Sequence, residues 1–178
     1  GGGLPDGLVA TFPSGDIASA YYVGSTKRYA HGIMGDAIEA SGLTVTTHDG
    51  REMSVELPGS EVFEDRYPRL ADLDGDGAVE VITIRSSNRA GAAVTIYGLE
   101  GTRLVQKATT AFIGRANRWL NIAAIAPFLV GNANQIAYVT TPHIGGTLRI
   151  IGYQNGTLTS HGDAYGFSNH WNGSTQLL

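Results

Sequence analysis

The chain has 178 residues, enough for one domain, and 42% of them are hydrophobic, enough to form a core. Its net charge of −4, without any cluster of lysine and arginine, argues against nucleic acid and anionic membrane surfaces as partners. The lack of cysteine excludes disulfides, and no apolar run reaches the roughly 18 residues of a membrane-spanning helix, so we expect no membrane insertion.

The first predicted strands lie before residue 58. The segment "SAYYV" (19–23) has the composition of a strand. The next segment, "HGIMGDAIEASG" (31–42), could form a short helix by propensity, but its alternating "DAIEA" favours a strand. In "SGLTVTTHDGREMSVEL" (41–57), Asp49-Gly50 separates two β-forming runs, which predicts a hairpin.

The same order of elements returns twice. The segments "PRLADL" (68–73) and "EVITI" (80–84) precede the predicted hairpin "AAVTIYGLEGTRLVQ" (92–106), which turns at Glu100-Gly101. Further along, "NIAAIAPFL" (121–129) and "QIAYV" (135–139) precede the predicted hairpin "GTLRIIGYQNGTLTS" (146–160), which turns at Asn155-Gly156. The chain therefore contains a repeating unit of three or four strands.

The spacing of the two tryptophans gives the length of this unit. The pattern G-x-x-N-x-W that ends at Trp119 recurs 52 residues later and ends at Trp171. Units of about 40 to 50 residues with four strands are typical of β-propeller blades, whereas a β-helix would have a shorter repeat. We therefore predict an all-β, propeller-like protein.

Three blades account for most of the chain. We predict one repeat domain over 1–178, with blades at about 16–66, 67–118 and 119–170. Residues 171–178 would then begin a further blade or exchange with a neighbouring chain. Because a closed propeller needs at least about four blades, three units predict self-association, as a closed dimer or a fibre, or the remaining blades of a longer chain.

Four carboxylates lie within nine residues in "ADLDGDGAVEVITI" (71–84). The alternation D-x-D-x-D lets a tight loop turn its acids inward, and a glycine after the third acid permits the bend. The predicted ligands are the side chains of Asp72, Asp74, Asp76 and Glu80 and the carbonyl of Ala78. Hard oxygen ligands in a flexible loop favour Ca²⁺, with Mg²⁺ second because it requires a stricter octahedron.

Two alternatives to this calcium loop are an EF-hand and a solvated acidic turn. An EF-hand would need a glutamate at the twelfth position, which is Thr83, and helices on both sides, where strands are expected. A solvated acidic turn would need no ion, but the full pattern next to a strand favours the metal.

The segment "PRLADLDGDGAVEVITI" (68–84) resembles the FG-GAP/VCBS repeat, the bacterial relative of integrin α-subunit propeller blades. The resemblance implies a calcium loop between the first two strands of a blade, and Asp72, Asp74, Asp76 and Glu80 match the ligand positions. The resemblance covers the repeating body of the chain from about Ala18 to the end. The wider pattern more weakly resembles exported proteobacterial propeller proteins.

The third unit carries a neutral version of this loop. Its segment "APFLVGNANQI" (126–136) has Pro127 at the position of the first acid, and amides follow in place of carboxylates. We therefore expect the loop from Pro127 to Gln135 to hold no Ca²⁺.

Catalytic motifs are not evident in the sequence. The five histidines are scattered, no pair has helical i,i+4 ligand spacing, and the serines lack a G-x-S-x-G elbow. The aromatic residues Trp119, Trp171, Tyr67 and Phe167 could form a sugar-binding platform, but packing between blades is favoured because each blade must bury its face.

These observations predict a non-catalytic, calcium-stabilised module for binding or self-assembly, with a carbohydrate or protein ligand. A lectin-like or enzymatic domain on a propeller scaffold is the alternative. The resemblance implies an extracellular, cell-surface or periplasmic location. The opening "GGGLPDG" is no signal peptide, as expected of a mature exported protein or a trimmed chain.

Overall fold

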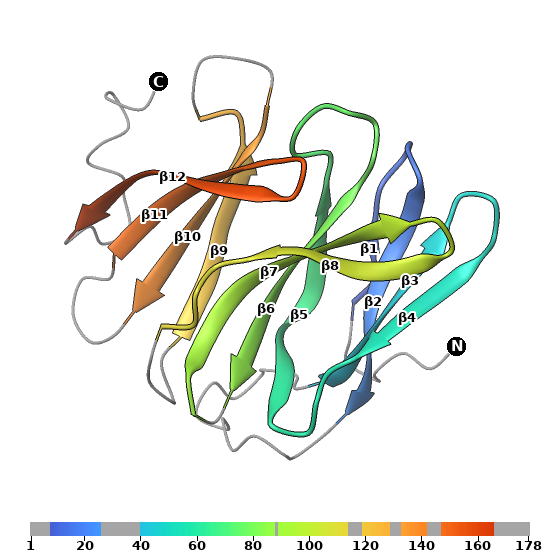
Figure 1. Cartoon of the computed structure of the whole chain (residues 1–178), viewed down its shortest axis with the longest axis horizontal. Coiled ribbons are helices and arrows are strands. Elements are labelled where there is room, and N and C mark those ends of the chain that lie inside the picture. The colour runs from blue at the N-terminus through green and yellow to red at the C-terminus, as the bar shows by residue number, and fades with distance from the viewer. Residues whose placement is uncertain are drawn as a thin grey trace.

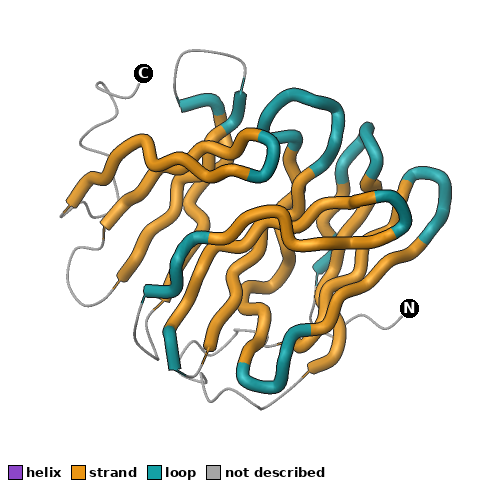
Figure 2. The backbone as a smooth tube through the Cα atoms, in the orientation of Figure 1, coloured by secondary structure: helices purple, strands orange, loops and turns teal. Residues whose placement is uncertain are grey.

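The computed structural model describes residues 8–25, 40–87, 89–113, 119–128, 133–141 and 147–165. All regular elements in these residues are β-strands joined by loops and turns, so the prediction of an all-β protein is confirmed (Figure 1, Figure 2). Among the same residues, no helix is long and apolar enough to cross a membrane.

The strands follow one another through short connections. They are β1 (Ala10–Thr11), β2 (Ile17–Ser25), β3 (Ala40–Thr47), β4 (Glu52–Glu56), β5 (Glu61–Ala71), β6 (Glu80–Ser87), β7 (Gly91–Glu100), β8 (Arg103–Thr109), β9 (Trp119–Ala126), β10 (Gln135–Thr141), β11 (Thr147–Gln154) and β12 (Thr157–Tyr165).

Antiparallel pairing arranges these strands as three consecutive meanders. The first meander is β1 to β4, the second is β5 to β8 and the third is β9 to β12, and within each meander every strand pairs with the next. A single pair, Ala40 with Phe63, joins the first two meanders into one eight-stranded sheet, while the third forms a separate four-stranded sheet. The described pairings close neither sheet into a barrel.

The predicted hairpins form where their turn residues lie. Gly50 and Gly101 adopt positive φ angles of 91° and 64° in the β3–β4 and β7–β8 turns, and Asn155 and Gly156 adopt 46° and 87° between β11 and β12. Glycine and asparagine tolerate this left-handed conformation, so these dipeptides place the turns.

Some strand limits differ from the prediction. The strand β5 begins at Glu61, before residue 67 where the second unit was expected to start, because a register shift between Glu64 and Arg69 lets one strand continue through an irregular segment. Trp119 is the first residue of β9. Trp171, most of the segment 31–42 and residues 171–178 lie outside the described residues.

The second meander is buried on both faces. On one face Val81, Tyr97 and Leu104 belong to a core shared with the first meander. On the opposite face Ile82 and Val94 belong to a core shared with the third. Because side chains alternate along a strand, neighbouring residues of β6 serve different cores. The three meanders therefore lie one after another and share cores between them, and Figure 1 shows this order.

Candidate metal site

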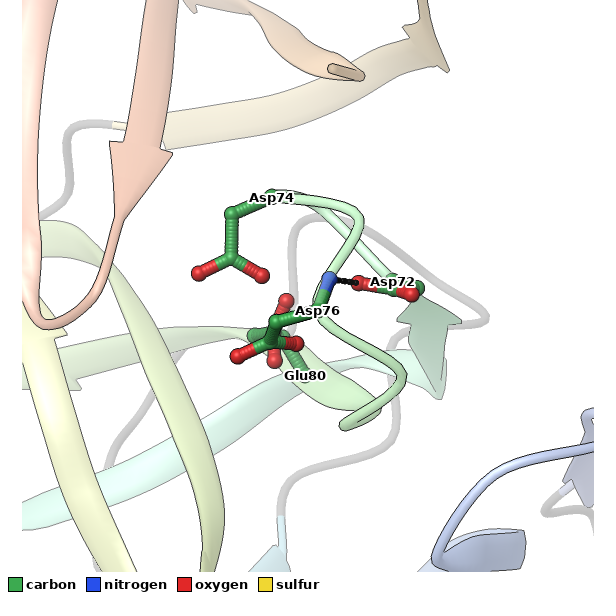
Figure 3. A group of neighbouring side chains, drawn as sticks. All are labelled: Asp72, Asp74, Asp76 and Glu80. Atoms are coloured by element: carbon green, nitrogen blue, oxygen red, sulfur yellow. Dashed lines mark hydrogen bonds between the residues drawn. The ribbon is translucent and has the colours of Figure 1, made fainter. Parts of the chain in front are cut away.

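The acidic loop connects the first two strands of the second meander. The strand β5 ends at Ala71 and β6 begins at Glu80, and these two residues pair across the sheet, which closes residues 72–79 into a compact loop. The structure brings the four predicted carboxylates together: one oxygen from each of Asp72, Asp74, Asp76 and Glu80 lies within 4.8 Å of the others (Figure 3).

Asp72 organises the backbone of the loop. Its Oδ1 accepts hydrogen bonds from the N–H groups of Gly75 at 2.9 Å and Asp76 at 3.2 Å, and its Oδ2 accepts one from Gly77 at 2.9 Å. Gly75 and Gly77 have φ angles of 74° and 87°, which favour glycine. The loop is thus wound around its first carboxylate.

The other three acids point toward one another. Figure 3 shows the carboxylates of Asp74, Asp76 and Glu80 converging, whereas Asp72 turns toward the loop backbone. Asp76 Oδ1 accepts the N–H of Ala78 at 2.9 Å, and Glu80 Oε1 accepts the N–H of Leu73 at 2.7 Å. The carbonyl of Ala78 remains a predicted ligand.

One oxygen of Asp74 lacks a partner. Its Oδ2 accepts the N–H of Asn155 at 3.1 Å, but its Oδ1 is buried without a hydrogen bond to any described residue. A buried acceptor left unpaired is costly, and a cation in the cluster would satisfy it.

Burial and mutual repulsion act against full ionisation of the cluster. Glu80 is only 4% exposed, and this burial raises its pKa to about 8, with the charges of Asp74, Asp76 and Asp72 adding to the effect and the N–H of Leu73 opposing it. Burial also raises the pKa of Asp74, and Asp76 contributes to that shift. A bound cation would stabilise all four charges at once.

Neighbouring meanders hold the loop from both sides. From the first meander, Asp16 Oδ1 accepts the N–H of Val79 at 2.8 Å. From the third, Asn134 donates its N–H to the Leu73 carbonyl at 3.1 Å and its Nδ2 to the Asp72 carbonyl at 3.4 Å, while Asn155 binds Asp74 as described above. The acidic loop is therefore a junction of all three meanders.

Sequence reasoning missed Asp16, Asn134 and Asn155 as supports of this loop. They lie 63, 62 and 81 residues away from the groups that they bind. Local motif spacing carries no signal for such contacts, because only the stacking of meanders brings these residues together.

In the third meander a neutral side chain occupies the position of Glu80. Gln135 opens β10 as Glu80 opens β6, and its Oε1 accepts the N–H of Phe128, seven residues earlier, at 2.8 Å. Its Nε2 donates to the Ala133 carbonyl at 3.1 Å. The amide bridges its turn without a charge. That the loop from Pro127 to Gln135 holds no Ca²⁺ stays a prediction.

The remaining candidates of the sequence are dispersed. His48 is exposed in the β3–β4 turn, and Tyr67 lies in β5 with the Arg69 guanidinium 4.9 Å from its ring centre. His161 lies on β12. The other histidines and Phe167 are outside the described residues.

Comparisons with protein-family models, with curated proteins and with solved structures give no match for this chain. The resemblance to FG-GAP/VCBS repeats therefore stays a prediction from the motif.

Proposed function

We propose that this chain is a non-catalytic, calcium-stabilised β-repeat module whose three meanders are propeller-like blades. Its role is binding or assembly at the cell surface, outside the cell or in the periplasm. The observation that supports this best is the acidic loop at the junction of the three meanders, where the side chains of four acids lie close together and one buried oxygen of Asp74 has no hydrogen-bond partner among the described residues.

Calcium is the ion that this donor set favours. All predicted ligands are oxygens, namely the carboxylates of Asp72, Asp74, Asp76 and Glu80 and the carbonyl of Ala78, and the loop between them contains two glycines. Ca²⁺ accepts 6–8 oxygens at about 2.3–2.6 Å in irregular geometry, whereas Mg²⁺ requires a near-ideal octahedron. Water would complete the shell on the exposed side.

The proposed role of the ion is to fix the packing of the meanders. The loop keeps its hydrogen bonds with Asp16, Asn134 and Asn155 only while it keeps its shape. Without a cation, repulsion among the acids acts against that shape. Calcium therefore stabilises the interface between repeats as well as the loop itself.

Assembly is proposed from the order of the meanders. Leu43 in the first meander and Val94 in the second each belong to a core shared with the following meander. In the third meander Leu148 forms a separate apolar cluster with Ala137 and Ile150, and these three side chains are already buried within the chain. We propose that a further repeat, from a longer chain or from a second copy, extends the stack beyond the third meander.

Calcium titration by calorimetry tests this function. The chain, first stripped with a chelator, should bind one Ca²⁺ per molecule, and Asp74→Asn should abolish binding. Asp49→Asn is a matched control, because Asp49 is an exposed carboxylate of the β3–β4 turn outside the cluster. Absence of calcium binding, or binding that Asp74→Asn leaves unchanged, would refute the proposal.

A further inference from the structure

A hollow of about 300 Å³ opens on the third meander beside the acidic loop. Its lining includes Asn134 before β10, Tyr153 and Gln154 at the end of β11, and Thr159 and His161 on β12. This volume is at the lower end of the range for small-molecule sites, about 300–1,000 Å³.

A β-bulge and a glycine direct His161 into this hollow. In the β11–β12 register, Ile150 pairs with Gly162 and Ile151 pairs with Ser160, so His161 is the extra residue of the bulge. A Cβ on Gly152 would lie 2.6 Å from His161 Nε2, so the imidazole lies directly over the strand at a glycine and would have to shift if residue 152 carried a Cβ. Bulges of this kind redirect a side chain and are common next to binding sites.

The second meander has the same bulge with charged side chains. There Lys107 is the extra residue, it lies over Gly98, and its Nζ lies 3.4 Å from Glu100 Oε2. His161 lies 54 residues after Lys107, and Gln154 lies 54 residues after Glu100, so these residues correspond in the two meanders. An ion pair in one repeat is thus replaced in the next by an imidazole and an amide that line a hollow.

The groups in the hollow define the chemistry of its ligand. None of the lining residues is Asp, Glu, Lys or Arg, so the hollow itself offers no charged side chain to pair with an ionic ligand. Gln154, Thr159 and His161 are exposed, and no hydrogen bond joins their side chains to other described residues. An apolar ligand would strip water from these groups without replacing its hydrogen bonds.

We propose that this hollow binds one residue of a neutral sugar. Sugar hydroxyls donate and accept hydrogen bonds, as an amide, a hydroxyl and an imidazole require. The exposed imidazole of His161 adds a flat ring, while Tyr153 lines the hollow with a side chain that is largely buried in the core. The site rests on the proposed function, because Asn134 in its wall binds the acidic loop that calcium would hold. The proposed site names neutral sugars as the ligand class of the binding module.

Nuclear magnetic resonance titration tests the proposal on the full chain, isotopically labelled and in excess calcium. The probes are the methyl glycosides of glucose, galactose, mannose and N-acetylglucosamine at up to tens of millimolar. At least one should shift the amide signals of 152–161 saturably. His161→Ala and Thr159→Val, at exposed positions, should each weaken binding by about tenfold. His48→Ala and Lys107→Ala should leave binding unchanged.

The outcomes separate this proposal from the calcium role. Lack of saturable shifts with all four glycosides in the calcium-loaded protein overturns the sugar site alone. Shifts that His161→Ala and Thr159→Val leave unchanged overturn it as well. Sugar binding by a chain that fails to bind calcium supports the hollow and refutes the proposed calcium role.

Discussion

Glu80 and Gln135 open equivalent strands, one at a candidate ion site and the other at a turn that an amide bridges. Each accepts a backbone N–H from seven residues earlier, and the amide also donates a hydrogen bond, which an ionised carboxylate cannot do. Glu80→Gln should therefore keep the fold and abolish calcium binding. In chelator at pH 9, above the pKa of about 8 of Glu80, it should unfold at higher denaturant concentration than the unaltered chain, because a buried charge is removed. Equal or lower stability in chelator would contradict this explanation.

Glu64 should make stability depend on pH independently of calcium. Burial raises its pKa from 4.5 to about 7, the charge of Asp65 adds to the shift, and the Ser86 hydroxyl opposes it. Because the folded state holds the proton more tightly, its stabilising contribution is complete below about pH 4.5 and is lost as pH rises through about 7. Between pH 5 and 8 we expect the unfolding free energy, measured by chemical denaturation, to fall by about 2 kcal/mol. This pH dependence should be absent in Glu64→Gln. An unchanged pH profile in that variant would refute the assignment.

At the scale of elements, the acidic loop depends on left-handed glycines. A Cβ on Gly77 would meet no atom within 4 Å, so Gly77→Ala changes only the cost of its φ of 87°. We expect a loss of about 1 kcal/mol in unfolding free energy together with weaker calcium binding. Gly59→Ala is the matched control, since Gly59 has equal space and no positive φ. Equal effects of Gly77→Ala and Gly59→Ala would show that the left-handed conformation of Gly77 contributes neither to stability nor to calcium binding.

The elements that could be predicted are those whose signals are contiguous. Asp49-Gly50 and Asn155-Gly156 marked two hairpins, and the acids between Asp72 and Glu80 marked one loop. The start of β5 was missed because Glu61 to Arg69 lacks alternation and its pairing is interrupted. The hollow at His161 was missed because a bulge, which sequence spacing does not reveal, turns that side chain.

At the scale of the whole molecule, stacking of repeats predicts self-association. The first two meanders each share a core with a following meander, whereas Leu148 and Ile150 of the third form a separate buried cluster. Light scattering at micromolar concentration should give a mass above the 18.7 kDa of one chain, decreasing on dilution. A monomer at all concentrations would mean that this chain does not supply the missing repeat to a second copy.

The central claim is that an ion in the acidic loop stabilises the packing of all three meanders. Thermal unfolding in excess calcium and in excess chelator tests it most directly, with Asp74→Asn measured beside the unaltered chain. We predict one cooperative transition that calcium raises by several degrees, as expected for about 2–3 kcal/mol of binding energy, and no response to calcium in Asp74→Asn. Identical melting curves for the unaltered chain in calcium and in chelator would contradict the claim.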